Sequence, residues 1–190
     1  RSVKDAPVRR VMVVAMCLGV MLSGIELLAP STFADLLGSP TAASGLYGVL
    51  TAVAFGTAAL GAAMSARIPG RRPAVAAGAY VTGAGIVLLV GVPLIGVAAA
   101  AFLLFYVVIG VQGPVMAWLL HDRVDSTVRS TMLSVESLAL QGGGAFASLV
   151  VGALSAGVGL VAGLAVIAVA AVAAAGVLWR DLGQSSSSRV

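Results

Sequence analysis

Few side chains in this sequence can bind or transfer a proton, and those that can lie inside long apolar stretches. Glu26 follows an uncharged run that begins after Arg10, while Gln112 and Gln141 interrupt two other such runs. A carboxyl group in an apolar environment is a candidate proton carrier, and an amide there offers a hydrogen bond where few others exist. These residues therefore indicate proton binding and recognition of a small molecule.

Other common chemistries are disfavoured by the residues that are missing. The single cysteine, Cys17, cannot form a disulfide within the chain, and the single histidine, His121, does not supply the paired ligands of a zinc site. We therefore expect no metal and no cofactor. The basic residues do not form a patch interleaved with aromatic side chains, so nucleic-acid binding is disfavoured despite a net charge of +4.

The composition indicates lipid as the surroundings of this chain. Of its 190 residues, 11 are Lys or Arg and 7 are Asp or Glu, so that only 9% carry a charge. A soluble domain has about 25%. Hydrophobic residues make up 60% of the chain, and the mean hydropathy is +1.10. We expect an integral membrane protein that is not an enzyme.

Proline and glycine divide the uncharged stretches into lengths that cross a bilayer. The stretch 73–120 contains 48 residues, whereas one crossing takes about 20. Gly91-Val92-Pro93 divides it, because proline interrupts a helix, and similar breaks occur at 30–44 and 155–159. The predicted fold class is an all-α membrane protein with six transmembrane helices, at 11–29, 44–66, 73–91, 94–119, 131–154 and 159–179.

The basic residues all fall on one side of this arrangement. They lie before the first span, between the second and third, between the fourth and fifth, and after the sixth, and the other three connections have none. Because short cytoplasmic loops collect Lys and Arg, we expect both termini in the cytoplasm. Residues 1–10 are then a cytoplasmic linker without the apolar core of a signal sequence, 11–179 the helical bundle, and 180–190 a disordered, Ser-rich tail.

Glu26 has two interpretations that the sequence supports about equally. It lies 16 residues after Arg10, which is about 24 Å along a helix. In one interpretation the carboxyl group loads and releases a proton inside the membrane. In the other, Glu26 lies four residues before Pro30 and extends its carboxylate to the outer headgroups.

Three further charged residues and a second amide are candidates. Glu136 follows Arg129 by seven residues, about 10 Å, and a gating or structural ion pair with Arg129 or Arg123 is favoured over a substrate contact. Gln141 precedes three glycines, 142–144. Glycines allow close helix packing, the favoured interpretation, or a local unwinding that leaves Gln141 lining a cavity.

The connection before the fifth span carries a resemblance to a known family. Residues 129–134 read RSTMLS, which is similar to the RATVLS loop before helix eleven in bacterial drug-efflux-like members of the major facilitator superfamily. Gly152-Ala153-Leu154 followed by Gly159 resembles the sequence where helix eleven turns into helix twelve. The loop 67–72 resembles the family's DRxGRR loop, but Arg67 stands in place of its Asp, so the role of that Asp is not carried over.

The resemblance covers about residues 5–180 and implies the C-terminal half of such a transporter. This half is one bundle of two inverted three-helix repeats, which works with an N-terminal six-helix half by alternating access. We expect that half upstream, since the sequence begins with Arg1 and not with an initiator methionine. The resemblance also implies a bacterial inner, or plasma, membrane as the location, and a small molecule and H⁺ as the species transported.

Three other functions are compatible with a chain of this size and composition and are compared with transport. A rhomboid-type protease needs Gly-x-Ser-Gly and an intramembrane His, but Met21-Leu22 precede Ser23-Gly24 and His121 lies in a loop, which excludes it. A six-helix substrate-binding membrane subunit of an ATPase-driven importer fits the size, although the RSTMLS loop disfavours it. A purely structural membrane protein would leave Glu26 and Gln141 unexplained.

The sequence thus predicts a secondary transporter, with proton-coupled export of small amphipathic or drug-like molecules. A sugar carrier is disfavoured because the chain contains no Asn. Proton coupling and the substrate cavity are assigned to Glu26, Gln141 and Gln112. Gating or structural charges are assigned to Glu136, Arg129 and Arg123.

Overall fold

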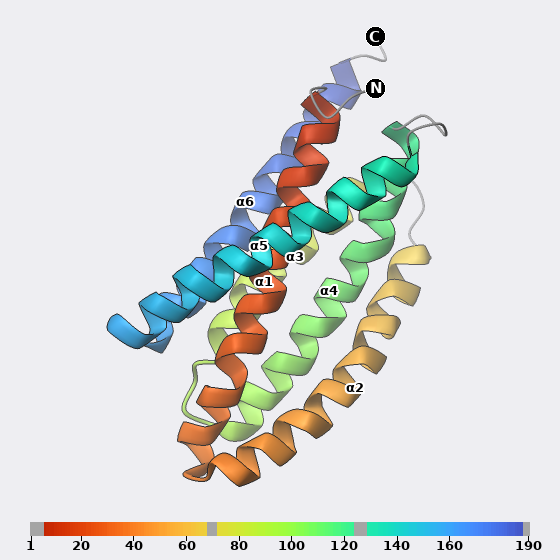
Figure 1. Ribbon diagram of the computed structural model, residues 1–190. Coiled ribbons are helices and arrows are strands. Elements are labelled where there is room, and N and C mark those ends of the chain that lie inside the picture. The colour runs from red at the N-terminus through yellow and green to blue at the C-terminus, as the bar shows by residue number, and fades with distance from the viewer. Residues whose placement is uncertain (1–5, 68–71, 124–128, 188–190) are drawn as a thin grey trace.

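The computed structural model describes residues 6–67, 72–123 and 129–187, and the regular structure in these ranges is helical. The helices follow one another with alternating direction (Figure 1). The start of α1 and the end of α6 therefore lie at the same end of the bundle. The bounds are α1 (Ala6–Leu37), α2 (Pro40–Ala66), α3 (Arg72–Leu89), α4 (Ile95–Arg123), α5 (Arg129–Gly157) and α6 (Leu160–Ser187).

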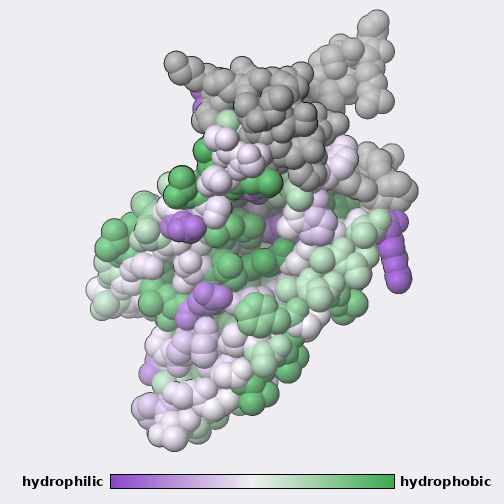
Figure 2. Space-filling model, turned by 45° about the vertical axis from the view of Figure 1, so that its right-hand side comes forward, coloured by the Kyte–Doolittle hydropathy of each residue, from purple (hydrophilic) through white to green (hydrophobic). Residues whose placement is uncertain are grey.

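Most of the described helices have the length and composition of membrane spans. Five are long and apolar enough to cross a bilayer, namely α1, α2, α4, α5 and α6, whereas the apolar part of α3, Ala74–Leu89, is shorter. Large apolar side chains such as Leu149 (74%) and Val161 (72%) are exposed on the outside, and hydrophilic residues are few on the described surface in Figure 2. Lipid accommodates such a surface. The chain is an all-helical integral membrane protein.

The described basic residues gather at one end of the bundle, which we name the arginine end. Arg9 and Arg10 lie in the first turns of α1, and Arg67 follows the last residue of α2. The helix bounds place Arg72, Arg123 and Arg129 at the same end (Figure 1). The turns at the opposite end, residues 38–39, 90–94 and 158–159, contain no basic residue.

Tight turns at the opposite end depend on local sequence. Gly38 follows α1 with φ of 62°, and Gly159 separates α5 from α6 with φ of 121°, conformations that disfavour any side chain. Ser39 caps α2, where its Oγ accepts a hydrogen bond from the Ala42 amide at 3.3 Å. Pro40 then occupies the first helical position, where a missing N–H costs nothing.

Two predicted boundaries are wrong in an informative way. The first span was expected to end at residue 29, but α1 continues through Pro30 to Leu37. Proline removes one helical hydrogen bond, and the buried neighbours Ala29 and Phe33 hold the helix in place by packing. Likewise α6 continues to Ser187 where a disordered tail was expected over 180–190, because an existing helix lengthens without a new nucleation cost.

The predicted breaks at 91–93 and 155–159 agree with the structure. The helix α3 ends at Leu89 because the amides of Val90, Gly91 and Val92 bond to carbonyls three residues back, as in a tightening 3₁₀ turn. Residues 1–5 of the predicted linker lie outside the described residues, and α1 already begins at Ala6.

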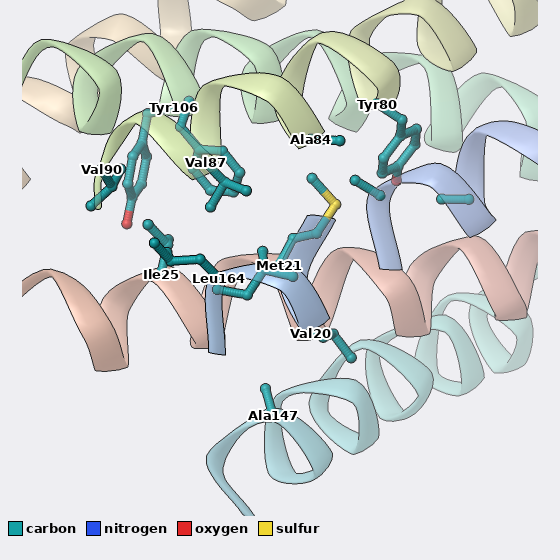
Figure 3. Close-up of a cluster of buried hydrophobic side chains, with 14 of the residues drawn as sticks. Val20, Met21, Ile25, Tyr80, Ala84, Val87, Val90, Tyr106, Ala147 and Leu164 are labelled. Atoms are coloured by element: carbon teal, nitrogen blue, oxygen red, sulfur yellow. The ribbon is translucent and has the colours of Figure 1, made fainter. Parts of the chain in front are cut away.

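The core is apolar where α1, α3, α4 and α6 meet. Figure 3 shows Met21 of α1 directed toward Ala84 of α3, with Leu164 of α6 beside it. Met21 and Leu164 are both buried. Packing of this kind positions α1 at the centre of the bundle, so that its remaining polar residues are held at defined levels.

Backbone contact between α1 and α5 depends on two glycines. Gly19 of α1 lies against the backbone carbonyl of Leu140, and Gly143 of α5 lies against that of Met16. A Cβ atom at either glycine would overlap the opposing carbonyl. Because apolar surface alone does not drive helix association in lipid, this close approach is a main source of packing.

The crossing of α2 and α4 has the same layout. Gly61 of α2 lies against the carbonyl of Val107, and Gly110 of α4 lies against that of Ala58. In both crossings, the opposing carbonyl belongs to the residue three positions before the partner's glycine. Two pairs of helices thus pack by one reciprocal arrangement.

Substitution of Gly143 by Ala should destabilise the bundle, because the new Cβ meets the Met16 carbonyl. Overpacking of this kind costs about 1–3 kcal/mol. The matched control is Gly142→Ala, which faces open space and should gain up to about 1 kcal/mol in helix propensity. The measurement is circular dichroism during SDS titration of the chain in detergent micelles. Equal stability of the two variants would contradict the packing described.

Candidate functional site

One polar contact joins α1 to α4 across the bundle. The Tyr106 hydroxyl donates a hydrogen bond to Glu26 Oε1 at 2.8 Å. Tyr106 is buried, with 4% of its surface exposed, whereas Glu26 is exposed. The contact therefore fixes one oxygen of the carboxyl group against α4 and leaves the carboxyl group accessible from outside the bundle.

Aromatic rings from three helices support the Tyr106 side chain. The Tyr106 and Phe102 ring centroids are 5.1 Å apart. Phe102 in turn meets Phe33 of α1 at 6.1 Å and Tyr47 of α2 at 5.8 Å, both edge to face. Such packing restricts the phenol ring, so that its hydroxyl is held where Glu26 can accept its hydrogen bond.

Pro30 adds a backbone acceptor at the same level of α1. A proline nitrogen carries no hydrogen, so the carbonyl four residues earlier, that of Glu26, loses its usual helical donor. Glu26 therefore presents both a carboxyl group and a backbone carbonyl without a helical N–H partner. This concentration of acceptors suits the binding of a proton or of a ligand that carries hydrogen-bond donors.

The arginine end is distant from this pair. Arg10, at that end of the same helix, lies 16 residues from Glu26, about 24 Å along the axis. The partner of the carboxyl group is thus a tyrosine hydroxyl. A proton can be exchanged there without the separation of an ion pair, and separating an ion pair in a low-dielectric environment is costly.

Gln112 lies inside the bundle. Its side chain is fully buried (0% exposed) in α4, and neither amide atom has a hydrogen-bond partner among the described residues. It is six residues from Tyr106, about 9 Å along the helix. The structure does not bring Gln112 together with Glu26, and its predicted role in a substrate cavity stays a prediction.

Gln141 is also separate from Glu26. It is exposed on α5, where its Nε2 atom donates to Ser137 Oγ on the same helix at 3.2 Å. The helix is continuous through the three glycines that follow, and Gly143 and Gly144 pack against α1. Close packing, the favoured interpretation of these glycines, is confirmed.

Glu136 is half-buried on α5, two turns from the arginine end. Its predicted partners Arg123 and Arg129 are the last residue of α4 and the first of α5, so the backbone brings both to that end. The side chains of these two arginines lie outside the described residues, and the ion pair stays a prediction.

Tyr106 is the residue that the sequence did not assign to the site. A tyrosine in an apolar span is also typical of an interfacial anchor, and the contact with Glu26 bridges 80 positions of sequence. The sequence signal that could have identified Tyr106 is its hydroxyl group, which lies in a predicted span without charged residues. The described residues contain no group of three His, Cys, Asp or Glu side chains arranged to hold a metal ion.

No protein-family model matches this chain, and no curated protein matches it either.

Replacement of Tyr106 by Phe should free the Glu26 carboxyl group with little change in shape. We expect Glu26 to react several-fold faster with a hydrophobic carbodiimide, because the carboxyl group has lost the hydroxyl that engages it. The modification is read by mass spectrometry of the peptide that contains Glu26. Tyr47→Phe, which retains the Tyr106 hydroxyl, is the matched control. Equal rates of Glu26 modification in Tyr106→Phe and Tyr47→Phe would contradict the hydrogen bond between Tyr106 and Glu26.

Proposed function

We propose that this chain is one six-helix half of a major facilitator superfamily transporter, which exports small amphipathic or drug-like molecules in exchange for protons. The observation that carries the proposal is the exposed Glu26 carboxyl group, which accepts a hydrogen bond from Tyr106 and lies within the candidate membrane span Val8–Leu37. A carboxyl group that faces lipid at this depth is costly. The cost is avoided if Glu26 faces a cavity closed by a second six-helix half.

The Tyr106 contact supports proton binding over the other interpretation of Glu26. A carboxylate that extended toward the outer headgroups would point along α1, away from α4. Here the side chain is engaged by a hydroxyl of α4 instead. Protonation of Glu26 would neutralise the charge and weaken that hydrogen bond, since a charged acceptor binds a donor more strongly than a neutral one. Protonation of Glu26 thereby weakens the contact between α1 and α4.

The glycine crossings support the proposed pair of inverted repeats. Gly19 of α1 corresponds to Gly110 of α4, and Gly143 of α5 corresponds to Gly61 of α2, each in the same reciprocal contact. In Figure 1, α1 and α4 run in opposite directions, as inverted repeats require. We therefore relate α1–α3 to α4–α6 by an approximate twofold axis in the membrane plane.

Six crossings are proposed rather than five. The helix α2 ends at the arginine end and α4 begins at the opposite end, so α3 has to connect the two ends although its apolar part is short (Figure 1). Because short cytoplasmic loops collect basic residues, we propose that the arginine end faces the cytoplasm. A location in a bacterial inner membrane follows from the proposed family.

In this mechanism the chain's own residues bind and release the proton. Glu26 takes up a proton while the cavity is open to the outside and releases it after the cavity has opened to the cytoplasm. Tyr106 positions the carboxyl group in both states. Release of the substrate to the outside would precede protonation, as exchange of the two species requires.

The test is Glu26→Gln in the full-length protein, in inside-out membrane vesicles. Without a titratable group, a pH gradient should no longer accelerate uptake of the amphipathic dye ethidium, so that the ratio of rates with and without the gradient falls to about one. Glu26→Asp keeps a carboxyl group and should retain a response. Gradient-driven uptake that is unchanged in Glu26→Gln would eliminate the proposed role.

A further inference from the structure

A polar cavity lies at the end of the bundle opposite the arginine end. Its volume is about 380 Å³, and it lies between the C-terminal parts of α1 and α5 and the start of α6. We name it the Asp35 pocket. Its oxygen-bearing side chains are those of Ser31, Thr32, Asp35 and Ser155, and its apolar walls include Leu27 and Leu160.

The oxygen atoms of the Asp35 pocket are mostly acceptors. The hydroxyls of Ser31 and Thr32 both donate to the Leu28 carbonyl, at 2.9 and 2.8 Å. A hydroxyl has one hydrogen, so these two oxygens can only accept from a further partner. An ionised Asp35 carboxylate also only accepts. Three of the four polar side chains therefore call for a ligand that donates hydrogen bonds.

Ser155 adds an oxygen without a partner. Its Oγ atom is buried and has no hydrogen-bond partner among the described residues. This atom lies where residue 163 would carry a Cβ, so the side chain fits only because that residue is Gly163. The hydroxyl is enclosed between α5 and α6, so Ser155 forms part of the pocket wall without offering an open acceptor to a ligand.

The local electrostatics favour a cation. The pocket lies near the C-terminal ends of α1 and α5, where helix dipoles place partial negative charge, and the start of α6 at Leu160, which also lines it, brings partial positive charge. The formal charge of an ionised Asp35 carboxylate is therefore what favours a cation. Neither α1 nor α5 has a basic residue in its last turn to offset that charge. The described arginines lie at the other end of the bundle, so Asp35 is the nearest formal charge to the pocket along α1 on that side.

We propose that the Asp35 pocket binds the ammonium group of a small organic amine. The volume of about 380 Å³ is in the range of small-molecule sites, about 300–1,000 Å³, and exceeds what a bare metal ion needs. The ammonium group donates to Asp35 and to hydroxyl oxygens of α1, while the carbon chain lies against Leu27 and Leu160. Asp35 lies nine residues beyond Glu26, about 13 Å along α1, so this site does not depend on the proposed transport function.

Binding of butylammonium to the full chain in detergent micelles, followed by isothermal titration calorimetry, tests the proposal. Neutral 1-butanol and anionic butyrate have the same carbon chain, and neither should bind. Asp35→Asn should weaken binding about tenfold or more, the effect of a lost charged hydrogen bond. Ser44→Ala, which removes a hydroxyl outside the pocket that bonds to the Pro40 carbonyl, should have no effect. Helix content by circular dichroism identifies variants that fold.

Each contrary outcome overturns the proposal. Equal binding of 1-butanol would mean simple partition into an apolar groove. Binding that is equal in Asp35→Asn and the unchanged chain would place the amine elsewhere. Tighter binding of Na⁺ than of butylammonium would make the pocket an inorganic cation site. Ethidium transport by Glu26 variants is unaffected by these results, so the two proposals fail separately.

Discussion

Exclusion of water by lipid is the constraint on which this structure depends. Backbone N–H and C=O groups in a bilayer must be paired within the protein, and a helix pairs them inside one segment. The helices of this chain meet that requirement, and α1 and α4 continue through Pro30 and Pro114. Because apolar surface gives little association in lipid, packing depends on glycines that admit a neighbouring backbone.

Polar groups are placed sparingly within this framework. Glu26 and Tyr106 form a link between α1 and α4, and the Asp35 pocket lies nearer the end of the same helix. Between these levels and the arginine end, the core around Met21 is mainly apolar, and Gln112 and Ser65 are buried polar residues there. The carboxyl group and the acceptor-rich pocket lie at different levels of α1, so the proposed proton site and the proposed amine site are separate.

The fold was largely predictable because its signals are local. Glycine and proline at 91–93 mark a turn through their own backbone preferences, and the grouping of arginines needs no tertiary information. The end of α1 was wrongly predicted, because the packing of Ala29 and Phe33 outweighs the local effect of Pro30. Local backbone preferences determine where a helix ends if the segment packs against nothing. Tertiary contacts determine the helix end if neighbouring side chains pack against the segment.

The candidate site was predictable only in part. Glu26 was identified because a carboxyl group in an apolar span is costly. Its link to Tyr106 was not, since which residues face one another across 80 positions depends on how α1 and α4 cross. For the same reason the sequence could not separate Gln112, which is buried, from Gln141, which is exposed. Periodicity alone does not say which side of a uniformly apolar helix meets a neighbour.

The proposed position of the arginine end on the cytoplasmic face is tested most directly by cysteine labelling in intact cells. In a variant whose Cys17 is replaced by Ala, single cysteines at Ser39, Val158 and Ala66 report the two ends of the bundle. A membrane-impermeant maleimide should label Ser39→Cys and Val158→Cys from outside, and Ala66→Cys only after permeabilisation. Labelling of Ala66→Cys in intact cells, with Ser39→Cys and Val158→Cys protected, would contradict the account.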